Sequence, residues 1–372
     1  MKKRPFLGVF CLSCGMEERD YIVVGLGLAG MAFCEQLVAN NKSFVVYDSG
    51  KSSASRVSGG VYNPVILKRY TLPWEAEKLM DLAVPYYRRL TEKLQVNAMH
   101  DVAVLRLFSS PEDQNNWFEA ADKPGLNRFL RPQLRKEPIA GLNSPFHFGE
   151  VLETGRIDVP QLLDAYTAYL KNRNCLIQEN FEYDQMEFDD KPAVYKNQRS
   201  RYIVFAEGYG LKKNPFFSEL PLVGNKGEYI IIKAENLALD AALKSQFFII
   251  PLGGHHYKVG ATFNWKDKDA NPTTAAREEI LEKLRKVITC DFEVIDQEAG
   301  VRPTTGDRRA LLGKHPHYPN LALLNGLGTR GIMASPHLAQ MLYAYLENDQ
   351  NLPEIVDIMR FPKKFDKVKS EK

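Results

Sequence analysis

The sequence predicts an α/β protein with two domains, the second of α+β type around an antiparallel sheet. Its 372 residues suffice for two domains of ordinary size. Short apolar strands alternate with helices at the start, in the middle and at the end of the chain, and two β-rich stretches separate these segments. A domain made of three pieces, with a second domain inserted between them, explains that order. We expect residues 17–75, 150–215 and 300–350 in the first domain, and 76–149 and 216–299 in the second.

A β-α-β unit begins near residue 21. Residues 21–24 form a short apolar run that ends at Gly25, as a buried parallel strand does. Residues 31–38 have the apolar spacing of a helix, and residues 43–47 form a second strand that ends at Asp48. The unit has about the ~30 residues of a β-α-β crossover.

The later elements follow from the same criteria of apolar spacing and turn residues. The pair Gly253–Gly254 between two apolar runs indicates an antiparallel hairpin. We expect further helices at 74–94, 159–171, 273–287 and about 336–346, and further strands at 102–105, 201–206, 229–232, 247–250, 257–260 and 321–324.

Composition and charge are those of an ordinary globular protein. Hydrophobic residues make up 44% and charged residues 26%, and a net charge of +3 is too small to indicate a nucleic-acid partner by itself. No apolar run reaches the ~20 residues that span a bilayer, so we expect no membrane partner. The five cysteines are scattered, which fits a reducing cytoplasm better than a disulfide scaffold. We therefore expect a cytoplasmic protein, and its oligomeric state stays open.

The first residues imitate a short signal peptide. A basic start is followed by a short apolar stretch, but no A-x-A cleavage site comes after it. We interpret residues 1–15 as a non-native extension upstream of a start at Met16. An export signal, which would place the protein outside the cytoplasm, is the alternative.

No metal site is predicted. Cys11 and Cys14 form a C-x-x-C without a second Cys or His pair. The histidines at 255–256 and at 315 and 317 lack carboxylate or Cys partners at metal spacing, so we interpret them as surface residues.

A glycine motif follows the first strand. Residues 25–30 match G-x-G-x-x-G between a strand and a helix, and Asp48 ends the next strand, 23 residues after Gly25. Gly25 permits the tight turn, Gly27 lets the backbone approach a pyrophosphate, and Gly30 lets helix and strand pack closely. The acid is placed to accept a hydrogen bond from a ribose hydroxyl. The motif predicts dinucleotide binding, with a glycine-rich structural turn as the alternative, and its place near the N-terminus favours FAD over NAD.

Two C-terminal segments carry a family resemblance. Residues 299–316, beginning Ala-Gly-Val-Arg-Pro, and residues 325–336, Asn-Gly-Leu-Gly-Thr-Arg-Gly-Ile-Met-Ala-Ser-Pro, resemble the closing segments of glycine oxidase and its relatives in the D-amino-acid-oxidase family. Residues 248–262 resemble the substrate-domain hairpin of that family, and residues 155–160 the re-entry into its flavin domain. The likeness covers nearly the whole chain from about residue 20.

The resemblance implies a Rossmann-like FAD-binding domain with an inserted antiparallel-sheet substrate domain. It implies an FAD-dependent oxidoreductase of primary or secondary amines, in which hydride passes from Cα to the flavin. No cysteine falls in residues 326–332, where some relatives attach the flavin, so we expect non-covalent FAD. The expected cofactor-binding residues are Gly25, Gly27, Leu28, Ala29, Gly30, Asp48, Ser55, Arg56, Gly59, Gly60, Val61, Glu207, Gly208, Arg302, Gly326, Gly328, Thr329, Arg330, Gly331 and Ile332.

The resemblance also implies a substrate site. The family places an arginine, matching Arg302, against the substrate carboxylate, which a guanidinium grips with two parallel hydrogen bonds. Arg330 is expected to assist, and Phe248 and Tyr257 to line the site; a structural salt bridge is the alternative for either arginine. Phe248 stands where glycine oxidase carries a tyrosine, and Glu207 where small residues are commoner. The first departure puts glycine itself in doubt as the substrate.

Two alternatives remain for the function. The oxidoreductase half of a bifunctional tRNA wobble-uridine modification enzyme belongs to the same family, and residues 260–263, 328–331 and 334–336 are similar to it. Its substrate is an N-substituted glycine on a base, which makes tRNA a candidate partner. A non-catalytic flavoprotein is the other alternative.

Overall fold

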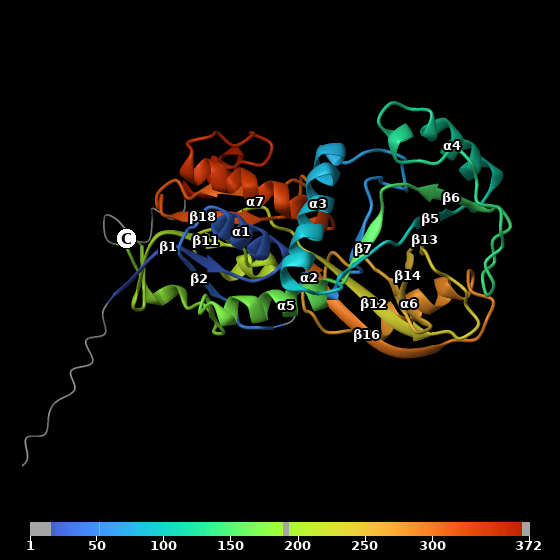
Figure 1. Cartoon of the computed structure of the whole chain (residues 1–372), viewed down its shortest axis with the longest axis horizontal. Coiled ribbons are helices and arrows are strands. Elements are labelled where there is room, and N and C mark those ends of the chain that lie inside the picture. The colour runs from blue at the N-terminus through green and yellow to red at the C-terminus, as the bar shows by residue number, and fades with distance from the viewer. Residues whose placement is uncertain (1–15, 52, 189–192, 367–372) are drawn as a thin grey trace, which may run out of the picture.

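The computed structural model describes residues 16–51, 53–188 and 193–366. Two large sheets lie next to each other along the long axis of the molecule, each with its own helices (Figure 1). Residues 1–15, predicted to be a non-native extension, lie outside the described residues. No described helix has the length and apolarity needed to cross a membrane.

The first sheet is mainly parallel. Its order is β17-β18-β11-β1-β2-β8, and only the edge strand β17 runs antiparallel on this path. Five parallel strands buried on both faces explain the short, continuous apolar runs seen in the sequence. The strands are β1 (Glu17–Val24), β2 (Phe44–Tyr47), β8 (Leu176–Ile177), β11 (Gln198–Phe205), β17 (Leu311–Lys314) and β18 (Leu321–Asn325), with β9 (Met186–Phe188) and β10 (Ala193–Tyr195) attached to β11.

Helices cover one face of this sheet. Side chains of α1 (Leu28–Ala39), α5 (Val159–Asn172) and α7 (Gly331–Glu347) share a single core with inward-facing residues of β1, β2, β11 and β18. α1 is apolar around most of its circumference because it is packed between the sheet and α7. The opposite face of the sheet forms a second core with the β9–β10 hairpin.

The second sheet is mainly antiparallel, in the order β16-β12-β15-β14-β13-β5-β6. α6 (Thr274–Leu284) packs on one face of it, and the other face packs against residues 61–72 and α4 (Pro111–Ala121). The strands are β5 (Val104–Leu107), β6 (Phe148–Val151), β12 (Asn225–Lys233), β13 (Ala242–Lys244), β14 (Phe248–Gly253), β15 (His256–Gly260) and β16 (Glu293–Arg302).

A small sheet, β3-β7-β4, and helix α3 connect the two halves. The strands of the small sheet are β3 (Val61–Tyr62), β4 (Met99–His100) and β7 (Gly155–Ile157).

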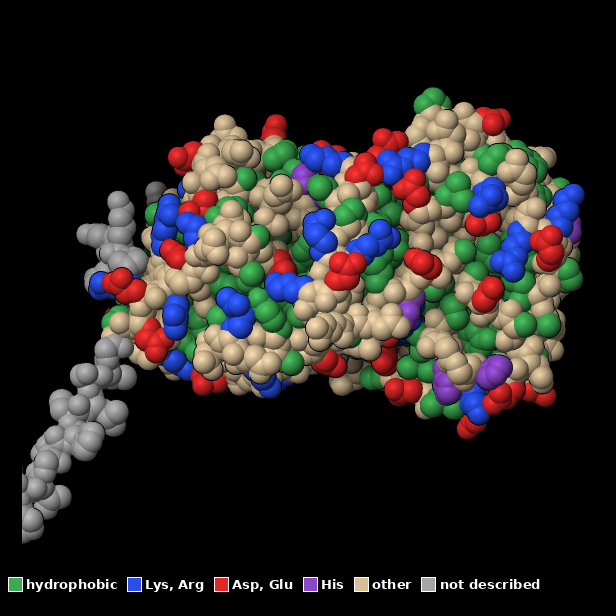
Figure 2. Space-filling view, in the orientation of Figure 1, with side chains coloured by type: hydrophobic (Ala, Val, Ile, Leu, Met, Phe, Trp, Pro, Cys, Tyr) green, Lys and Arg blue, Asp and Glu red, His purple; other side chains and the backbone are tan. Residues whose placement is uncertain are grey.

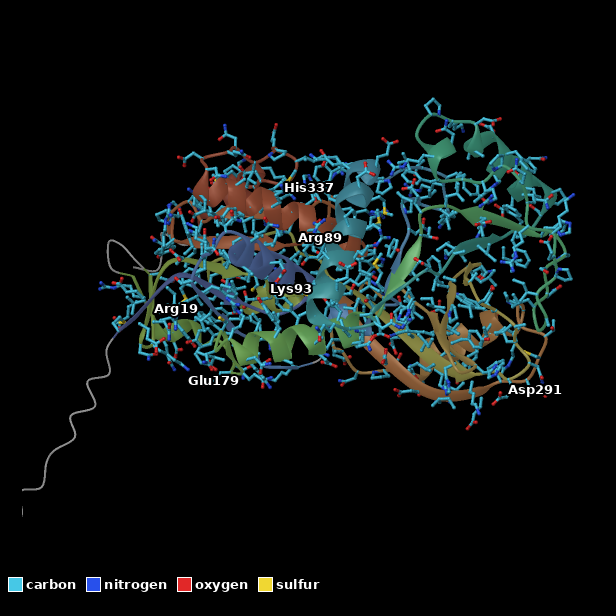
Figure 3. The ribbon with its side chains drawn as sticks, viewed as in Figure 1. Arg19, Arg89, Lys93, Glu179, Asp291 and His337 are labelled. Atoms are coloured by element: carbon cyan, nitrogen blue, oxygen red, sulfur yellow. The ribbon has the colours of Figure 1, made fainter. Side chains whose placement is uncertain are left out.

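The predicted division of the chain into domains stays a prediction, but it placed residues 76–94 with the second domain. In the structure α3 (Ala76–Leu94) shares the core of the first sheet instead. Its Lys93 binds Glu35 of α1 at 2.8 Å, and the preceding Glu75 lies 3.2 Å from His337 of α7. Figure 3 labels Lys93 on α3 and His337 on α7.

Most predicted elements agree with the structure within a few residues, but the start of the last helix was wrong. The sequence predicted a helix from about 336, whereas α7 begins at Gly331 and contains Pro336 in its interior. Pro336 suggested a helix start because proline is common in the first turn. A side chain from α3 compensates for the missing backbone donor, as described in the Discussion.

Candidate active site

The loop between β1 and α1 carries the glycine motif. Gly25 has a φ of +98°, and a Cβ there would lie 2.7 Å from the carbonyl oxygen of Ala206, so a side chain is excluded. α1 begins at Leu28 without a side-chain cap from its N-cap residue and without an acid in its first turn. A Cβ on Gly27 would lie 3.0 Å from Ser55 Oγ. Ser55 Oγ accepts the Leu28 N–H at 3.2 Å, and the amides that follow at the start of α1 border a narrow space that suits a phosphate group.

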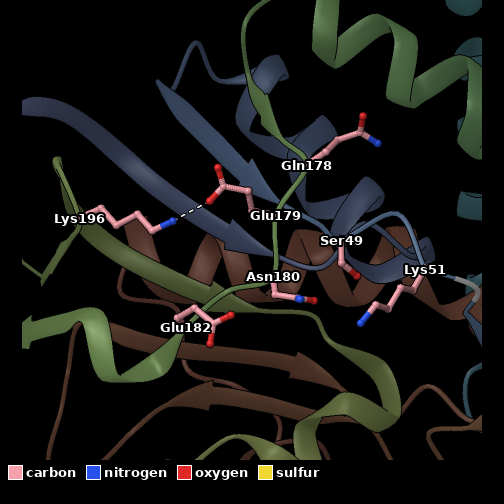
Figure 4. Close-up of a pocket in the computed structure, with 7 residues that line it drawn as sticks. All are labelled: Ser49, Lys51, Gln178, Glu179, Asn180, Glu182 and Lys196. Atoms are coloured by element: carbon pink, nitrogen blue, oxygen red, sulfur yellow. Dashed lines mark hydrogen bonds and ion pairs between the residues drawn. The ribbon is translucent and has the colours of Figure 1, made fainter.

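Asp48 ends β2 beside this loop. Its Oδ2 accepts the Leu26 N–H at 2.7 Å and its Oδ1 accepts the Gly50 N–H at 2.8 Å. The carboxylate thus holds the glycine loop and keeps further lone pairs for a ligand hydroxyl. A cavity of about 430 Å³ opens next to it, into which Asn180 and Lys51 extend (Figure 4). Its other lining residues are Ser49, Gln178, Glu182 and the Glu179–Lys196 ion pair, whose charged atoms are 2.6 Å apart.

The loop around α2 (Ala54–Val57) connects this region to the second sheet. Arg56, predicted to bind the cofactor, pairs with Asp164 of α5 at 2.7 Å. A Cβ on Gly59 would lie 2.4 Å from Ile250 Cδ1 and 3.5 Å from Tyr229 Oη. Gly59 therefore permits the close approach of this loop to the second sheet. The face of the sheet that carries Ile250 and Tyr229 is the one that borders the cofactor region.

The turn before α7 closes the other end of the region. The Asn325 side chain donates to the Gly208 carbonyl at 2.9 Å, which ties the turn to the end of β11. The Gly328 N–H donates to the Pro303 carbonyl at 3.0 Å. Thr304 Oγ1 is buried without a hydrogen-bond partner among the described residues, and it lies 3.8 Å from the position of a Cβ on Gly328. A bound ligand would supply a partner for this hydroxyl.

Arg302 stands at the end of β16 on the face that borders this region. Its Nη1 donates to Asn225 Oδ1 at 2.8 Å and to the Thr262 carbonyl at 3.3 Å. The guanidinium lies against Gly227, where a Cβ would be 1.9 Å from Nη2, and 4.8 Å from the ring centre of Phe263. No carboxylate among the described residues pairs with it. The arginine is therefore held by neutral groups, with Nη2 and Nε available to an anion.

Arg330 is a second cation without an acidic partner in the described part of the chain. It is the N-cap residue of α7 and is half-buried. Burial lowers the pKa of the Arg330 guanidinium from its ordinary value, and the charges of Arg308 and Arg309 lower it further. The positive charges of Arg308, Arg309 and Arg330 lie close together, and no acid neutralises Arg330 among the described residues. Together they favour the binding of an anion at Arg330.

The second sheet presents Phe248 on the same face as Ile250. Because side chains alternate along a strand, Phe248 and Ile250 face the cofactor region, whereas Ile249 lies in the core under α6. Phe248 is half-buried, and Lys244 Nζ lies 5.2 Å from the centre of its ring.

The substrate-binding role predicted for Tyr257 is wrong. Tyr257 is 4% exposed, belongs to the core under α6, and donates its hydroxyl to the Leu237 carbonyl at 2.5 Å. The neighbouring Lys258 faces the site side instead and pairs with Glu298. The prediction assigned Tyr257 to the wrong face of its strand, because side chains of neighbouring residues in a strand point to opposite faces.

Glu207 does not turn its carboxyl toward the glycine loop. It accepts hydrogen bonds from the hydroxyl of Tyr183 and from Asn214 Nδ2, the latter at 2.8 Å. Burial raises the pKa of the Glu207 carboxyl to about 7, although both hydrogen bonds act in the opposite direction. Its side chain therefore holds the segment after β11 together, and its backbone adjoins Gly25.

Sequence reasoning missed three residues around Arg302: Asn225, Gly227 and Phe263. Asn225 and Gly227 share a face of β12. The only sequence signal that could have linked them is their spacing of two residues, which places side chains on the same face of a strand. Their relation to Arg302 depends on the pairing of β12 with β16, which opposes Asn225 to Arg302. The expected contacts of Leu28, Ala29, Gly60, Val61, Thr329, Gly331 and Ile332 with a cofactor stay predictions.

These residues fit a dinucleotide cofactor. Groups for phosphate, ribose and ring atoms are provided by the helix start without an acid in its first turn, by the polar cavity beside Asp48 and by the unpartnered hydroxyl of Thr304. No group of three or more metal-ligating side chains occurs within residues 16–51, 53–188 and 193–366. The fold and site define a dinucleotide-binding protein whose cofactor region borders Arg302 of the second sheet and Arg330 at the start of α7, both without an acidic partner among the described residues.

A comparison with protein families identifies the class further. The family model described as FAD dependent oxidoreductase (DAO) matches residues 20–345. The chain belongs to this family, and it is an FAD-dependent oxidoreductase. The predicted family, fold class and general activity are thereby confirmed.

Two curated relatives are similar over most of the chain. Glycine oxidase of Bacillus subtilis is 23% identical over 90% of this chain and 95% of its own length. The tRNA 5-methylaminomethyl-2-thiouridine biosynthesis bifunctional protein of Pseudomonas aeruginosa is 25% identical over 88% of this chain. The chain spans only 56% of the length of that bifunctional protein.

Solved structures share the fold. Glycine oxidase from Geobacillus kaustophilus superimposes with a TM-score of 0.76 at 19% identity, covering 90% of this chain and 96% of that one. Iminodiacetate oxidase from Chelativorans superimposes with a TM-score of 0.71 at 17% identity, covering 90% and 97%.

Proposed function

We propose that this enzyme oxidises an amine that carries a carboxylate, either an amino acid or an N-substituted glycine. The observation that carries the proposal is the Arg302 guanidinium, which is half-buried, oriented by Asn225 and Thr262, and without an acidic partner in the described chain. A substrate carboxylate would supply the missing charge through charge-assisted hydrogen bonds.

FAD would lie along the glycine loop, with its adenosine near Asp48 and its flavin between the turn before α7 and the second sheet. When bound, FAD supplies a two-electron acceptor for hydride from the substrate Cα. Arg302 would hold the carboxylate and so fix the orientation of the Cα–H bond, which is a large part of the acceleration in such a reaction. Arg330 would add positive charge on the same side.

We further propose that FAD is bound without a covalent link. The turn at residues 326–332 contains no cysteine, and Cys34, the nearest to the glycine loop in sequence, is buried in the core of the first sheet. The free thiols of Cys34, Cys175 and Cys290 also support a reducing, cytoplasmic location.

The test is anaerobic mixing of the yellow protein with a panel of amines while flavin absorbance is followed. N-methylglycine and larger N-alkyl glycines should bleach the flavin, whereas N-methylethylamine, which lacks the carboxylate, should do so far more slowly. Bleaching by carboxylate-free amines at equal rates would contradict the proposal, and so would no bleaching by any amine in FAD-loaded protein.

A second candidate is an N-substituted glycine on a tRNA base. It is favoured by Phe263, which is 64% exposed beside Arg302, and by Trp265, which is 49% exposed two residues later; both would offer stacking surfaces for bases. Against it, basic and acidic side chains are interspersed on the face shown in Figure 2. Gel-shift titration with total tRNA at low and moderate salt separates the two candidates, because phosphate contacts make binding strongly salt-dependent.

A further inference from the structure

Lys244 is, after Arg302, a second cation on the site side of the second sheet without an acidic partner among the described residues. It is the last residue of β13, where it pairs with Phe248 of β14 and with Arg106 of β5. Its neighbour Leu243 lies in the core under α6, so alternation places Lys244 on the opposite face, with Phe248 and Ile250. That is the face that Ile250 brings against Gly59.

The charge of Lys244 is not neutralised by the described residues. Its Nζ lies 5.2 Å from the Phe248 ring centre and donates to the Gln246 carbonyl at 3.0 Å, and no carboxylate pairs with it. The adjacent Arg106, by contrast, binds Asp113 at 2.9 Å. Burial, followed by neighbouring positive charges, lowers the pKa of the Lys244 ammonium to about 8, so the group is mainly charged at neutral pH. The charges that contribute are those of Arg106, Lys283 and Lys68.

The strands β14, β15 and β12 lie between Lys244 on β13 and Arg302 on β16, and the segment after β15 reaches Arg302. Phe248 pairs with Gly260, so Lys244 is two strand spacings, about 10 Å, from the end of β15. Two residues later the Thr262 carbonyl accepts a hydrogen bond from Arg302. A ligand with two acidic ends must therefore span more than these two strand spacings to reach both cations, which requires an extended spacer of several bonds.

We propose that Lys244 is a specificity-determining residue that binds a second anionic group of the substrate, at the end of the amine substituent remote from the carboxylate held by Arg302. The preferred substrate is then an N-substituted glycine with an acidic group at the far end of its N-substituent. This inference rests on the proposed function, and it deepens it by naming the substrate class.

Binding is measured first, with ligands that cannot react. Calorimetric titration of the FAD-loaded protein compares heptanedioate, with two carboxylates, with heptanoate, which has one and the same chain length. Wild type should bind heptanedioate at least about tenfold more tightly, as expected for a charge-assisted hydrogen bond. Lys244→Met should abolish this preference, and Lys244→Arg should retain most of it. Equal affinity of wild type for the two acids would overturn the inference.

Kinetics then link the contact to turnover. Anaerobic flavin reduction compares N-(4-carboxybutyl)glycine with N-pentylglycine, which lacks only the distal acid. Lys244→Met should lower the apparent second-order rate constant about tenfold or more for the first amine and leave the second within about twofold. Equal losses for both amines would mean that Lys244 is structural, and the inference would be overturned.

The matched control is Lys283→Met, which removes the same charge from α6, where Lys283 pairs with Glu279. It should keep the preference for the diacid, and a loss of that preference would overturn the inference in favour of a diffuse charge effect. If neither amine reduces the flavin although the diacid preference depends on Lys244, the proposed function fails while the binding inference stands.

Discussion

The hydroxyl of Tyr87 donates a hydrogen bond to the carbonyl oxygen of Ile332 at 3.0 Å. In a regular helix that carbonyl would accept the N–H of the residue four positions later, which is Pro336 and has none. α3 therefore supplies the donor that the sequence of α7 lacks, directly after the turn expected to contact the flavin. The bond also fixes α3 to the cofactor half of the molecule.

Replacing Tyr87 with Phe should lower the free energy of unfolding by about 1–2 kcal/mol, because the buried Ile332 carbonyl loses its donor. Tyr86→Phe is the matched control, since the Tyr86 hydroxyl is buried without a hydrogen-bond partner in the described structure and its removal should cost nothing. Urea denaturation of the two variants at one fixed FAD concentration provides the comparison. Equal stabilities would show that the bond contributes nothing.

Replacing Gly27 with Val should abolish FAD retention while the protein stays folded. A side chain there meets Ser55 Oγ at 3.0 Å from its first carbon, and the rest of it enters the space at the start of α1. The ratio of flavin to protein absorbance after purification, with circular dichroism as a folding check, measures the effect. Gly210→Ala, where the nearest atom to the new Cβ is 3.5 Å away, should stay yellow. A fully yellow Gly27→Val protein would refute the assignment of this loop.

Replacing Arg302 with Lys should slow flavin reduction by a carboxylated amine at least ~10-fold. Lysine keeps the charge but not the planar fork, and a lost charge-assisted contact costs roughly 1.5–3 kcal/mol. The rate of flavin reduction by an amine of similar size without a carboxylate should change little. Stopped-flow reduction with both amines is the measurement. The exposed Arg277→Lys is the control variant. Equal losses for the two amines would assign Arg302 to the flavin or the fold.

Replacing Glu207 with Gln should remove a pH-dependent loss of stability. The carboxyl pKa is raised from 4.5 to about 7 in the folded protein, so its contribution is complete below pH 4.5 and is lost as pH rises through about 7. Wild type should therefore lose on the order of 2 kcal/mol relative to the variant between pH 5 and pH 8. Urea midpoints at several pH values measure the difference, with the exposed Glu187→Gln as control. Parallel pH profiles for wild type and Glu207→Gln would show that the carboxyl does not titrate in this range.

The cofactor half could be predicted from the sequence because its signals are local. Gly25, Gly27 and Asp48 lie within one β-α-β unit, and their spacing alone places them at one edge of the sheet. The second sheet was less predictable, because an apolar strand buried on both sides gives no indication of which face meets the cofactor. Tyr257 was misassigned for this reason, and Lys244 was overlooked.

A contact between residues far apart in sequence explains why the start of α7 was predicted wrongly. Pro336 disfavours a helix interior locally, and the donor that makes it acceptable is Tyr87, 245 residues away in sequence. No pattern around residue 336 could reveal it. The roles of Asn225 and Gly227 likewise depend on which strand lies beside β12.

The strand order of the first sheet has a consequence for synthesis on the ribosome. β1 is translated early, but its neighbour β11 begins at residue 198, and the next strand, β18, begins at residue 321. The Ala206 carbonyl that closes over Gly25 therefore leaves the ribosome long after the glycine loop does. The nascent chain carries an unpaired strand edge in the meantime, which is a hazard for aggregation and a place for a chaperone to act. The complete glycine loop, with Ala206 against Gly25, can therefore form only after residue 206 has been translated.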